Sequence, residues 1–263
     1  MTSTGTRSTS RARSGLNKLA LGVAAALAML GTAPAMAGVV NFESLSQDFY
    51  VGGQVLSENG YALQVVDTHE GGAGLAGVLL NGQDPTACWL GGCPTNNGSL
   101  YYAGIADGAL QITRDGGGAF SLSGLDYAFI GPTGGLANFS YGQLVLTGSL
   151  FDSGATVSYA LDFPGMDSVG NPLFDTASLS SSFAASALSS LTIRACLFDG
   201  NGGCVYPQDV TDPLLNQAQF ALDNISLADV TQADVPEPGS LALLGLGLGA
   251  LTLRRRKSAA KPA

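Results

Sequence analysis

The chain has 263 residues, of which 46% are hydrophobic, and its formal net charge is −9 at pH 7. Residues 38–234 carry 19 acidic side chains against two basic ones, Arg114 and Arg194, so the formal charge of this segment is 2 − 19 = −17. This charge argues against nucleic acid or anionic lipid as a partner, because Lys and Arg must neutralise phosphate groups. It favours solubility, repulsion between copies and divalent cations as partners.

The first 37 residues are typical of a secretory signal peptide. An apolar run over residues 19–30 is followed by Ala35-Met36-Ala37, the small-x-small pattern that signal peptidase accepts. The run is too short to span a bilayer comfortably. We therefore predict cleavage after Ala37 and a mature chain that begins at Gly38. The basic region before the apolar run consists of Arg7, Arg11, Arg13 and Lys18.

Residues 38–234 are rich in Gly, Ser, Thr, Asn and Asp and contain no Lys, a composition typical of short strands joined by tight turns. We therefore predict an all-β ectodomain of the jelly-roll-like β-sandwich class. Two of its strands form a hairpin around Asp152-Ser153-Gly154. The predicted strands are 39–43, 61–66, 109–113, 119–122, 125–130, 143–150, 155–161, 183–196 and 219–227. Residues 49–55 are a short element or part of a loop.

Residues 71–99 are predicted to be a long Gly- and Asn-rich loop, with a short strand at 78–80. Residues 72–77 match the dinucleotide-binding fingerprint, but Asn81-Gly82 and Pro85 would end a following helix before two turns, so we interpret them as a flexible loop. His69, the sole histidine, is interpreted as a solvated turn residue. The segment that begins at Asp199 starts like a calcium loop but departs from the pattern further on, and is interpreted as a turn.

Four cysteines occur as two local pairs, Cys88 with Cys93 and Cys196 with Cys204. In an exported chain an even, locally paired set indicates disulfides. Zinc is the alternative, but the spacings are wider than usual for zinc and the compartment is oxidising. Cross-paired disulfides remain open, and peptide mapping with and without reduction decides between them.

The predicted final strand alternates apolar residues at Phe220, Leu222, Ile225 and Leu227, with a break in phase at 223–224. Together with the opening Asn-Phe-Glu at 41–43, it resembles the two ends of jelly-roll carbohydrate-binding modules. In those modules an early Glu and a late Asp share a structural calcium ion. The resemblance therefore implies Glu43 and Asp223 as candidate calcium ligands, a role that suits hard carboxylate oxygens.

The C-terminal end has three parts in order. Val235-Pro236-Glu237-Pro238 is stiffened by two prolines, so no helix can start there. An uncharged run over residues 239–253 follows, and at 1.5 Å per residue its length is short of a hydrocarbon core of about 30 Å. Its length therefore suits a transient membrane helix. The run is closed by a cluster that should stay cytoplasmic, Arg254, Arg255, Arg256 and Lys257.

These three parts resemble the PEP-CTERM sorting signal, a substrate of exosortase, an inner-membrane enzyme similar to cysteine transpeptidases. The resemblance implies processing near Pro-Glu-Pro and delivery to the surface of a Gram-negative bacterium. Gln219, Phe220 and Asp223 also match the motif of the QFxxD subgroup of this family. The chain then divides into a signal peptide (1–37), an ectodomain (38–234), a sorting signal (235–257) and a tail (258–263).

The resemblance implies a non-catalytic, exported matrix protein associated with exopolysaccharide or biofilm. We expect no required cofactor, and a structural calcium ion is the one candidate. A glycan-binding module is the alternative, with an aromatic stacking platform at Trp89 and further aromatic residues at Tyr101, Tyr102 and Tyr141. A secreted hydrolase ranks below both, because the chain has no Gly-x-Ser-x-Gly turn. So does an ice-binding protein, since no Thr-x-Thr ladder is present although the tail has been catalogued with such proteins.

Overall fold

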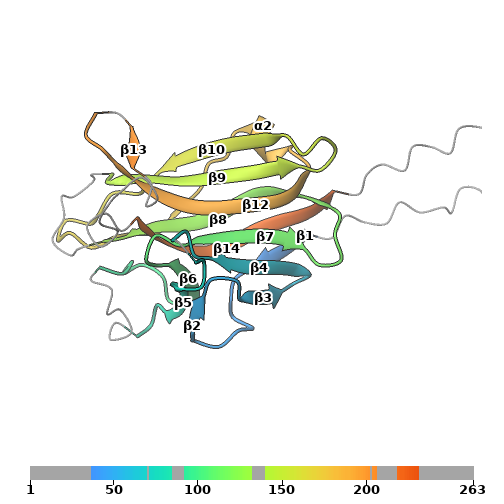
Figure 1. Cartoon of the computed structure of the whole chain (residues 1–263). Coiled ribbons are helices and arrows are strands. Elements are labelled where there is room, and N and C mark those ends of the chain that lie inside the picture. Colours follow the sequence, from blue (N-terminus) through green and yellow to red (C-terminus); the bar gives the residue numbers. More distant parts are fainter. Residues whose placement is uncertain are drawn as a thin grey trace, which may run out of the picture. The chain divides into compact units, whose positions relative to one another are not determined.

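The computed structural model describes residues 37–69, 71–84, 92–131, 140–201, 203–205 and 218–230. Within these residues the regular structure is β apart from one short helix, α2 (Ser181–Ala184), as Figure 1 shows. The strands are β1 (Ala37–Val40), β2 (Phe49–Val51), β3 (Val55–Glu58), β4 (Tyr61–Val66), β5 (Leu75–Asn81), β6 (Leu100–Gly104), β7 (Ala109–Arg114), β8 (Ala119–Ile130), β9 (Gly142–Leu150), β10 (Thr156–Asp162), β11 (Asp175–Thr176), β12 (Leu188–Phe198), β13 (Cys204–Val205) and β14 (Gln219–Val230). The prediction of an all-β domain is confirmed.

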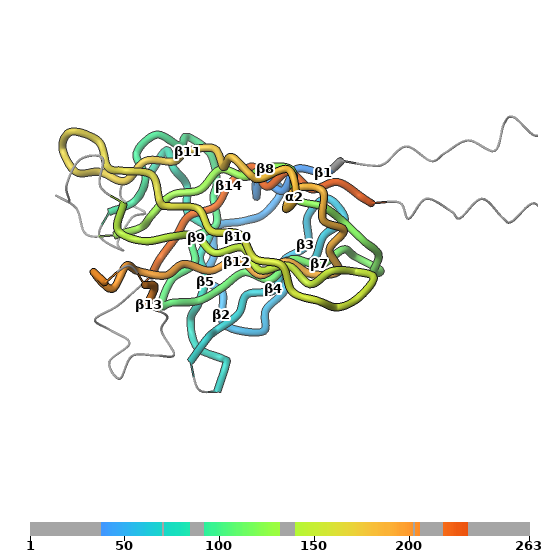
Figure 2. The backbone as a smooth tube through the Cα atoms, turned by 90° about the horizontal axis from the view of Figure 1, so that it is seen from above, coloured from blue at the N-terminus to red at the C-terminus, as the bar shows by residue number. Residues whose placement is uncertain are grey.

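Backbone hydrogen bonds join the strands into one curled sheet with the order β2-β5-β6-β14-β8-β12-β7-β4-β3. β1 pairs with β14, β11 with β8, and β9 and β10 extend the sheet beyond β12. The sheet turns back on itself at the single residue pair between Leu188 of β12 and Phe120 of β8. In Figure 2, β8, β11 and β14 lie along one side of the domain, and β9, β12 and β4 along the other. Two layers therefore face each other although one sheet forms both.

β14, the last strand of the domain, lies inside the sheet. One of its edges pairs with β8 over almost its whole length, and the other pairs first with β6 and then with β1. The register with β8 shifts between Asp223 and Ser226, and Asn224 adopts a left-handed φ of 48°. This is a β-bulge, and it explains the break in phase seen in the sequence, because the extra residue returns Ile225 and Leu227 to the core.

The main core lies between the two layers. Tyr61 of β4 packs edge-on against Phe120 of β8 with ring centroids 5.7 Å apart, so the contact bridges the layers. Tyr102 of β6 lies between Phe42 and Phe220, at 6.1 and 6.3 Å. These side chains are almost entirely buried, and each contributes on the order of 1.5–3 kcal/mol of hydrophobic stabilisation.

A second, smaller cluster covers the outer face of β5, β6, β8 and β14. Tyr101 belongs to it and packs edge-on against Phe174, with centroids 5.4 Å apart. Cys93 packs against the same cluster. The segments around Cys93 and Phe174 thus cover part of this face, which makes these strands buried on both sides. The buried members are Val78, Leu80, Tyr101, Ala103, Ile105, Ala128, Ile130 and Ala221.

The turn after β1 depends on a buried carboxylate. Phe42 is fully buried and has a φ of 62°, an uncommon conformation for a bulky residue. Glu58, at 6% exposure, accepts hydrogen bonds from the backbone N–H of Phe42 at 2.8 Å and from the hydroxyl of Ser44 at 2.8 Å. The chain therefore leaves the strand at residue 41, and the predicted strand 39–43 was wrong at its end: β1 is Ala37–Val40.

The short strand predicted at 78–80 lies within β5, Leu75–Asn81. The strand is longer than predicted and includes residues 75–77 of the Gly-rich fingerprint, so the predicted loop over 71–99 was wrong there. β6, at Leu100–Gly104, was not predicted at all. Both strands are buried on two faces and so lack the alternation that reveals a half-buried strand. Gly104 has no room for a side chain, since a Cβ there would lie 2.3 Å from Cε1 of Phe220.

Other boundaries differ more modestly. The two predicted strands at 119–122 and 125–130 are one strand, β8. The predicted strand at 183–196 instead covers the end of α2 and most of β12. The helix begins where it does because the side chain of Ser180 caps it, accepting a hydrogen bond from the backbone N–H of Phe183. The segment 49–55 is divided between β2 and β3. By contrast, the predicted strand 61–66 is β4 itself, and the hairpin around 152–154 is β9 and β10.

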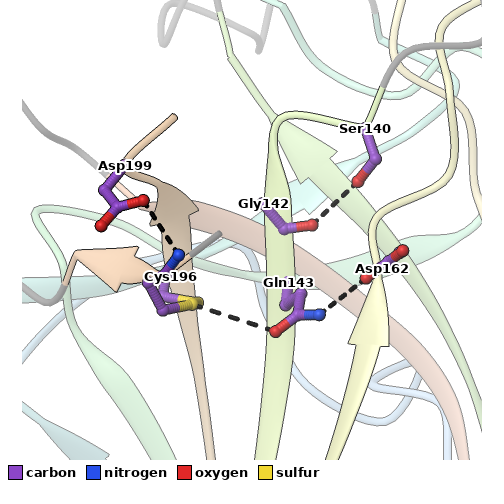
Figure 3. The surroundings of a disulfide bond; sticks show 8 residues. Ser140, Gly142, Gln143, Asp162, Cys196 and Asp199 are labelled. Atoms are coloured by element: carbon purple, nitrogen blue, oxygen red, sulfur yellow. Dashed lines mark hydrogen bonds between the residues drawn. A yellow bond between two sulfur atoms is a disulfide. The ribbon is translucent and has the colours of Figure 1, made fainter. Parts of the chain in front are cut away.

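The second cysteine pair forms the predicted disulfide, Cys196–Cys204, which pins the hairpin of β12 and β13. Figure 3 shows its surroundings, where the side-chain amide of Gln143 lies 4.0 Å from Cys204 Sγ and donates to Asp162 at 2.7 Å. Cys93 is also disulfide-bonded, while Cys88, with which the sequence pairs it, lies outside the described residues. Over the described part of the chain, no helix has the length and apolar character to cross a membrane.

Replacement of Glu58 by glutamine should lower the free energy of unfolding by about 1–3 kcal/mol, because a buried amide N–H₂ would face N–H and O–H donors. Urea denaturation followed by circular dichroism measures the change. Asp152→Asn, in the exposed β9–β10 turn, is the matched control and should leave the free energy unchanged. An unfolding free energy for the Glu58→Gln variant equal to that of the control would contradict this role.

Candidate functional site

A polar pocket of about 380 Å³ lies over the outer face of β8 and β14. Its floor is formed where these strands pair, one wall by residues 96–99 and the other by the segment that includes β11. No Lys, Arg or His is among the described residues that line it. They are Asn96, Asn97, Gly98, Ser99, Asp126, Phe174, Asp175, Thr176, Asp223 and Asn224. We call this the Asp126–Asp223 pocket.

Two carboxylates lie directly opposite each other in the pocket floor. Asp126 of β8 and Asp223 of β14 are register partners, and both follow the outer-facing phase of their strands. Like charges in this arrangement repel each other. The bulge at Asn224 comes immediately after Asp223, so the same irregularity that keeps the core in phase also ends regular pairing beside the two carboxylates.

Neutral donors hold both carboxylates. The hydroxyl of Thr176 donates to Oδ1 of Asp126 at 2.6 Å, and the side-chain amide of Asn224 donates to Oδ2 at 2.8 Å. Asp223 Oδ2 accepts from the side chains of Asn97 and Ser99, each at 2.8 Å. Its Oδ1 accepts from the backbone N–H of Asn224 at 2.7 Å. The acidic groups are therefore fixed in position without a cationic side chain.

Burial raises the pKa of Asp223, which is 1% exposed, and the charge of Asp126 adds to the rise. The hydrogen bonds from Asn97, Ser99 and Asn224 act in the opposite direction, because they stabilise the ionised form. The net direction is upward, so a positively charged or hydrogen-bonding ligand in the pocket would relieve an existing electrostatic cost.

The two candidate calcium ligands approach the same short segment. Glu43 accepts from the backbone N–H of Leu100 at 2.7 Å, and Asp223 accepts from the hydroxyl of the neighbouring Ser99. Within the residues that the structure describes, no group of three or more His, Cys, Asp or Glu side chains is arranged to hold a metal ion. Coordination of calcium by Glu43 and Asp223 would need further ligands from backbone or amide oxygens, and it stays a prediction.

The aromatic residues considered for sugar stacking have different environments. Tyr101 and Tyr102 are 2% and 0% exposed, so both belong to the cores and offer no face to a ligand. Tyr141 is half-buried and stacks on Phe129 with centroids 5.8 Å apart. Trp89 lies outside the described residues. Phe174, which the sequence analysis did not select, lines the pocket and is half-buried.

The three residues of the Gln-Phe-x-x-Asp motif all lie in β14, and their side chains are buried to 6% exposure or less. Phe220 packs in the main core against Tyr102, whereas Asp223 forms part of the pocket floor. The motif thus combines core packing with one pocket residue.

His69 lies in a different cluster from the pocket. Its Nδ1 is 2.9 Å from Oδ1 of Asp67. Burial pushes the pKa of Asp67 upward, but the backbone N–H and ring of His69 and the N–H of Gly74 together hold that pKa below its ordinary value. His69 is 34% exposed, in agreement with a turn residue bonded locally.

Asp107, near this histidine, is 3% exposed and has a φ of 58°. Its Oδ1 accepts from the backbone N–H of Ala218, whereas Oδ2 has no hydrogen-bond partner among the described residues. Burial raises the pKa of Asp107, and the hydrogen bond from Ala218 and the nearby His69 oppose that rise. The ionised carboxylate is therefore a cost to the fold at neutral pH.

Sequence reasoning found Asp223 but missed the other residues of the pocket. Two signals were available: Asp126 is the one charged side chain in an otherwise apolar and small-residue strand, and Asn96-Asn97-Gly98-Ser99 is a dense run of hydrogen-bonding groups. Neither signal shows that the run and the strand meet, because residues 97 and 223 are brought together by the sheet order.

The sorting residues themselves, 235–238 and 254–257, lie outside the described residues, as do residues 1–36 of the predicted signal peptide. Residues 234–257 match the PEP-CTERM protein-sorting motif, so the predicted sorting signal is confirmed. The motif begins four residues after the end of β14. It implies that the protein is exported, is processed by an exosortase and reaches the cell surface or exterior of a Gram-negative bacterium.

No curated protein matches the chain significantly. Among solved structures, a DUF4465 family protein from Bacteroides caccae ATCC 43185 has a TM-score of 0.46 and 14% identity, with 74% of this chain and 100% of that chain covered. TmCBM61 in complex with beta-1,4-galactotriose has a TM-score of 0.32 and 8% identity, with 64% and 88% covered. At these scores the likenesses assign no function.

Asp107→Asn should raise the free energy of unfolding at neutral pH by about 1 kcal/mol, because it removes a buried charge with an unpaired oxygen. The folded-state pKa is raised, so the penalty exists above that pKa and vanishes as pH falls below the ordinary Asp value of about 3.9. Urea denaturation over a pH series tests this, with Asp152→Asn as the control. A variant less stable than the parent at neutral pH would show that the ionised Asp107 stabilises the fold.

Proposed function

We propose that the protein is a non-catalytic component of the extracellular matrix, retained in exopolysaccharide or biofilm after exosortase has processed it. The observation that carries this proposal is the sorting motif at 234–257, placed directly behind a complete β domain. The domain is acidic and contains no Lys, so it should stay soluble and monomeric during export. The same negative charge disfavours nucleic acid as a partner.

The route to the exterior follows from the two ends of the chain. A signal peptide over residues 1–37 would direct export, and the apolar run at 239–253 would hold the chain in the inner membrane as a short helix. Arg254 to Lys257 would remain on the cytoplasmic side because charged groups cross the bilayer at high cost. The 15-residue run is short for a permanent anchor, which supports a transient role.

The finer classification belongs to the same proposal. We assign the chain to the QFxxD subgroup because Gln219, Phe220 and Asp223 have the spacing of its motif and all lie in β14. We regard the curled sheet as jelly-roll-like because its two layers enclose one main core. A non-catalytic role is supported by the Asp126–Asp223 pocket, whose carboxylates are each engaged by fixed neutral donors and lie apart from His69.

Glycan binding is the second candidate function, and the Asp126–Asp223 pocket favours it. Its lining supplies carboxylate, amide and hydroxyl groups, which are the partners that sugar hydroxyls require. Asn96, Asp175, Thr176 and Asn224 are exposed there, and Phe174 offers an apolar surface beside them. A pocket of about 380 Å³ is large enough for one or two sugar units, given that small-ligand sites are typically about 300–1,000 Å³.

Structural calcium at Glu43 and Asp223 remains part of the proposal. Both carboxylates approach residues 99–100, and calcium accepts a mixture of carboxylate and carbonyl oxygens. Millimolar calcium should therefore raise the melting temperature relative to a chelator, and Glu43→Gln should abolish that rise. The idea fails if calcium and chelator give the same melting curve for the parent protein.

Substitution of Pro236 and Pro238 by alanine should block processing, because the stalk before the membrane helix would lose its extended conformation. In the native host the variant should accumulate in the inner-membrane fraction, with the parent protein outside the cell. Fractionation followed by immunoblotting measures the distribution. Alanine at Lys261, behind the basic cluster, serves as control, and release of the proline variant at the parental level would contradict the sorting role.

For the glycan-binding function, Asp126→Ala should weaken retention on exopolysaccharide at least tenfold, because it removes the group that orders both Thr176 and Asn224. Affinity electrophoresis of the exported protein in gels that contain host exopolysaccharide measures retention. Asp152→Ala controls for lost charge, and unchanged melting controls for folding. Trp89→Ala tests the predicted stacking platform in the same assay, and unchanged retention of both variants would exclude these sites.

A further inference from the structure

A second pocket lies at the end of the domain where β1 begins and β14 ends. Its volume is about 760 Å³. It receives residues from β1, from the turn before β4, from the end of β7 and from β14. They are Gly38, Val39, Asn41, Asn59, Gly60, Tyr61, Arg114, Asp115 and Asp229. We call this the Asp229 pocket.

Asp229 is held firmly in this pocket. Nη2 of Arg114 donates to its Oδ2 at 2.7 Å, and the hydroxyl of Tyr61 donates to its Oδ1 at 3.2 Å. Burial, followed by the charge of Asp229, raises the pKa of Tyr61 to about 12, so the phenol stays protonated and continues to donate. The carboxylate is 15% exposed and therefore only partly screened by water.

Gly38 lines the same pocket as this carboxylate. In the antiparallel pair of β1 and β14, Gly38 is opposite Leu227 and Ala37 is opposite Ala228. The backbone that precedes Gly38 therefore runs along β14 in the direction of Asp229, which shares a face with Leu227. Gly38 also lies over the Tyr61 ring, since a Cβ at this position would be 3.2 Å from Cε2 of Tyr61.

Among the described residues that line the pocket, the charges do not balance. Arg114 supplies one positive charge, and Asp115 and Asp229 supply two negative charges, so the sum is 1 − 2 = −1. One added cation would bring the sum to zero. Other groups in the pocket, namely Asn59, Tyr61 and the glycines, are neutral.

We propose that the Asp229 pocket binds the α-ammonium group of Gly38. This inference rests on the predicted cleavage after Ala37, which belongs to the proposed function. Hydrolysis of the Ala37–Gly38 bond breaks C–N: water supplies the hydroxyl that leaves with Ala37 as a carboxylic acid and the proton that completes the Gly38 amine. At neutral pH the amine takes a further proton and becomes the cation that the pocket lacks.

The ammonium group would join the first strand of the mature domain to the last. Asn59 already fixes β1 by donating from its side-chain amide to the carbonyl of Val39 at 2.6 Å. A charged contact between Gly38 and Asp229 would attach the start of β1 to β14 as well. Removal of the signal peptide thus creates the ammonium group that the Asp229 pocket binds, and β1 and β14 both contribute to that pocket.

The chain allows this amine to be observed in isolation. Residues 38–234 contain no Lys, and the other amines are confined to Lys18, Lys257 and Lys261. Reductive methylation of the exported, processed protein with ¹³C-formaldehyde therefore labels the α-amine, whose methyl signals report its titration by NMR. Lys257 and Lys261, where the tag is retained, titrate at about pH 10.4, well above the α-amine at about 7.7–8.0.

The titration midpoint of the Gly38 amine should lie about one pH unit above that of an exposed α-amine, because an opposite charge nearby favours the ammonium form. Asp229→Asn and Asp115→Asn should each lower the midpoint. Asp152→Asn, an equal change of charge away from the pocket, should not. Asp115→Asn keeps the Arg114–Asp229 pair, so it covers the case in which Asp229→Asn fails to fold.

An ordinary midpoint that neither variant changes would overturn the inference while leaving the exported-matrix function untouched. N-terminal sequencing of the same sample separates the two. A first residue other than Gly38 would also overturn the inference, since the ammonium group would then lie elsewhere. Failure of the protein to be exported at all would instead contradict the proposed function.

Discussion

Hydrogen bonds along both edges of β14 join the first and last strands of the domain to the middle of the sheet. The strand pairs with β8 on one edge and with β6 and β1 on the other, so residues 40 and 225 become neighbours. Such a pairing closes a very long loop, which is slow and cannot occur before the C-terminal part of the domain is available. The sorting motif begins four residues later, so the tag follows the strand that completes the domain.

The same strand contributes residues to both pockets. Its bulge at 223–224 keeps Phe220, Leu222, Ile225 and Leu227 in the core and places Asp223 opposite Asp126 on the outer face. Six residues further along, Asp229 lines the second pocket, at the end of the domain where β1 begins and β14 ends. β14 thus packs in the core, forms part of the floor of the Asp126–Asp223 pocket and leads into the sorting signal. This connection explains why a β domain with few charged pairs can nevertheless place carboxylates at defined positions.

The sequence was sufficient wherever a local pattern decides the structure. β4 and the β9–β10 hairpin follow from alternation and turn chemistry. The break in the apolar pattern at 223–224 could be seen in the sequence, although the β-bulge that causes it could not. Of β5 the sequence predicted only residues 78–80, and β6 was not predicted, because burial on both faces removes alternation. Neighbouring rings leave no room for a side chain at Gly77 and Gly104. Asp126 and Asn97 were missed for a different reason: their meeting with Asp223 depends on sheet order, which local patterns do not encode.

Mass spectrometry of the mature protein from its native host tests the central claim most directly, because the claim is that β14 is delivered intact and the tag behind it is removed. The account predicts a chain that retains residues up to 230 and lacks the apolar run at 239–253 together with the basic cluster. A steady-state extracellular or surface form that still carries residues 239–257 would contradict it, and the domain would then be one held permanently by its C-terminal helix.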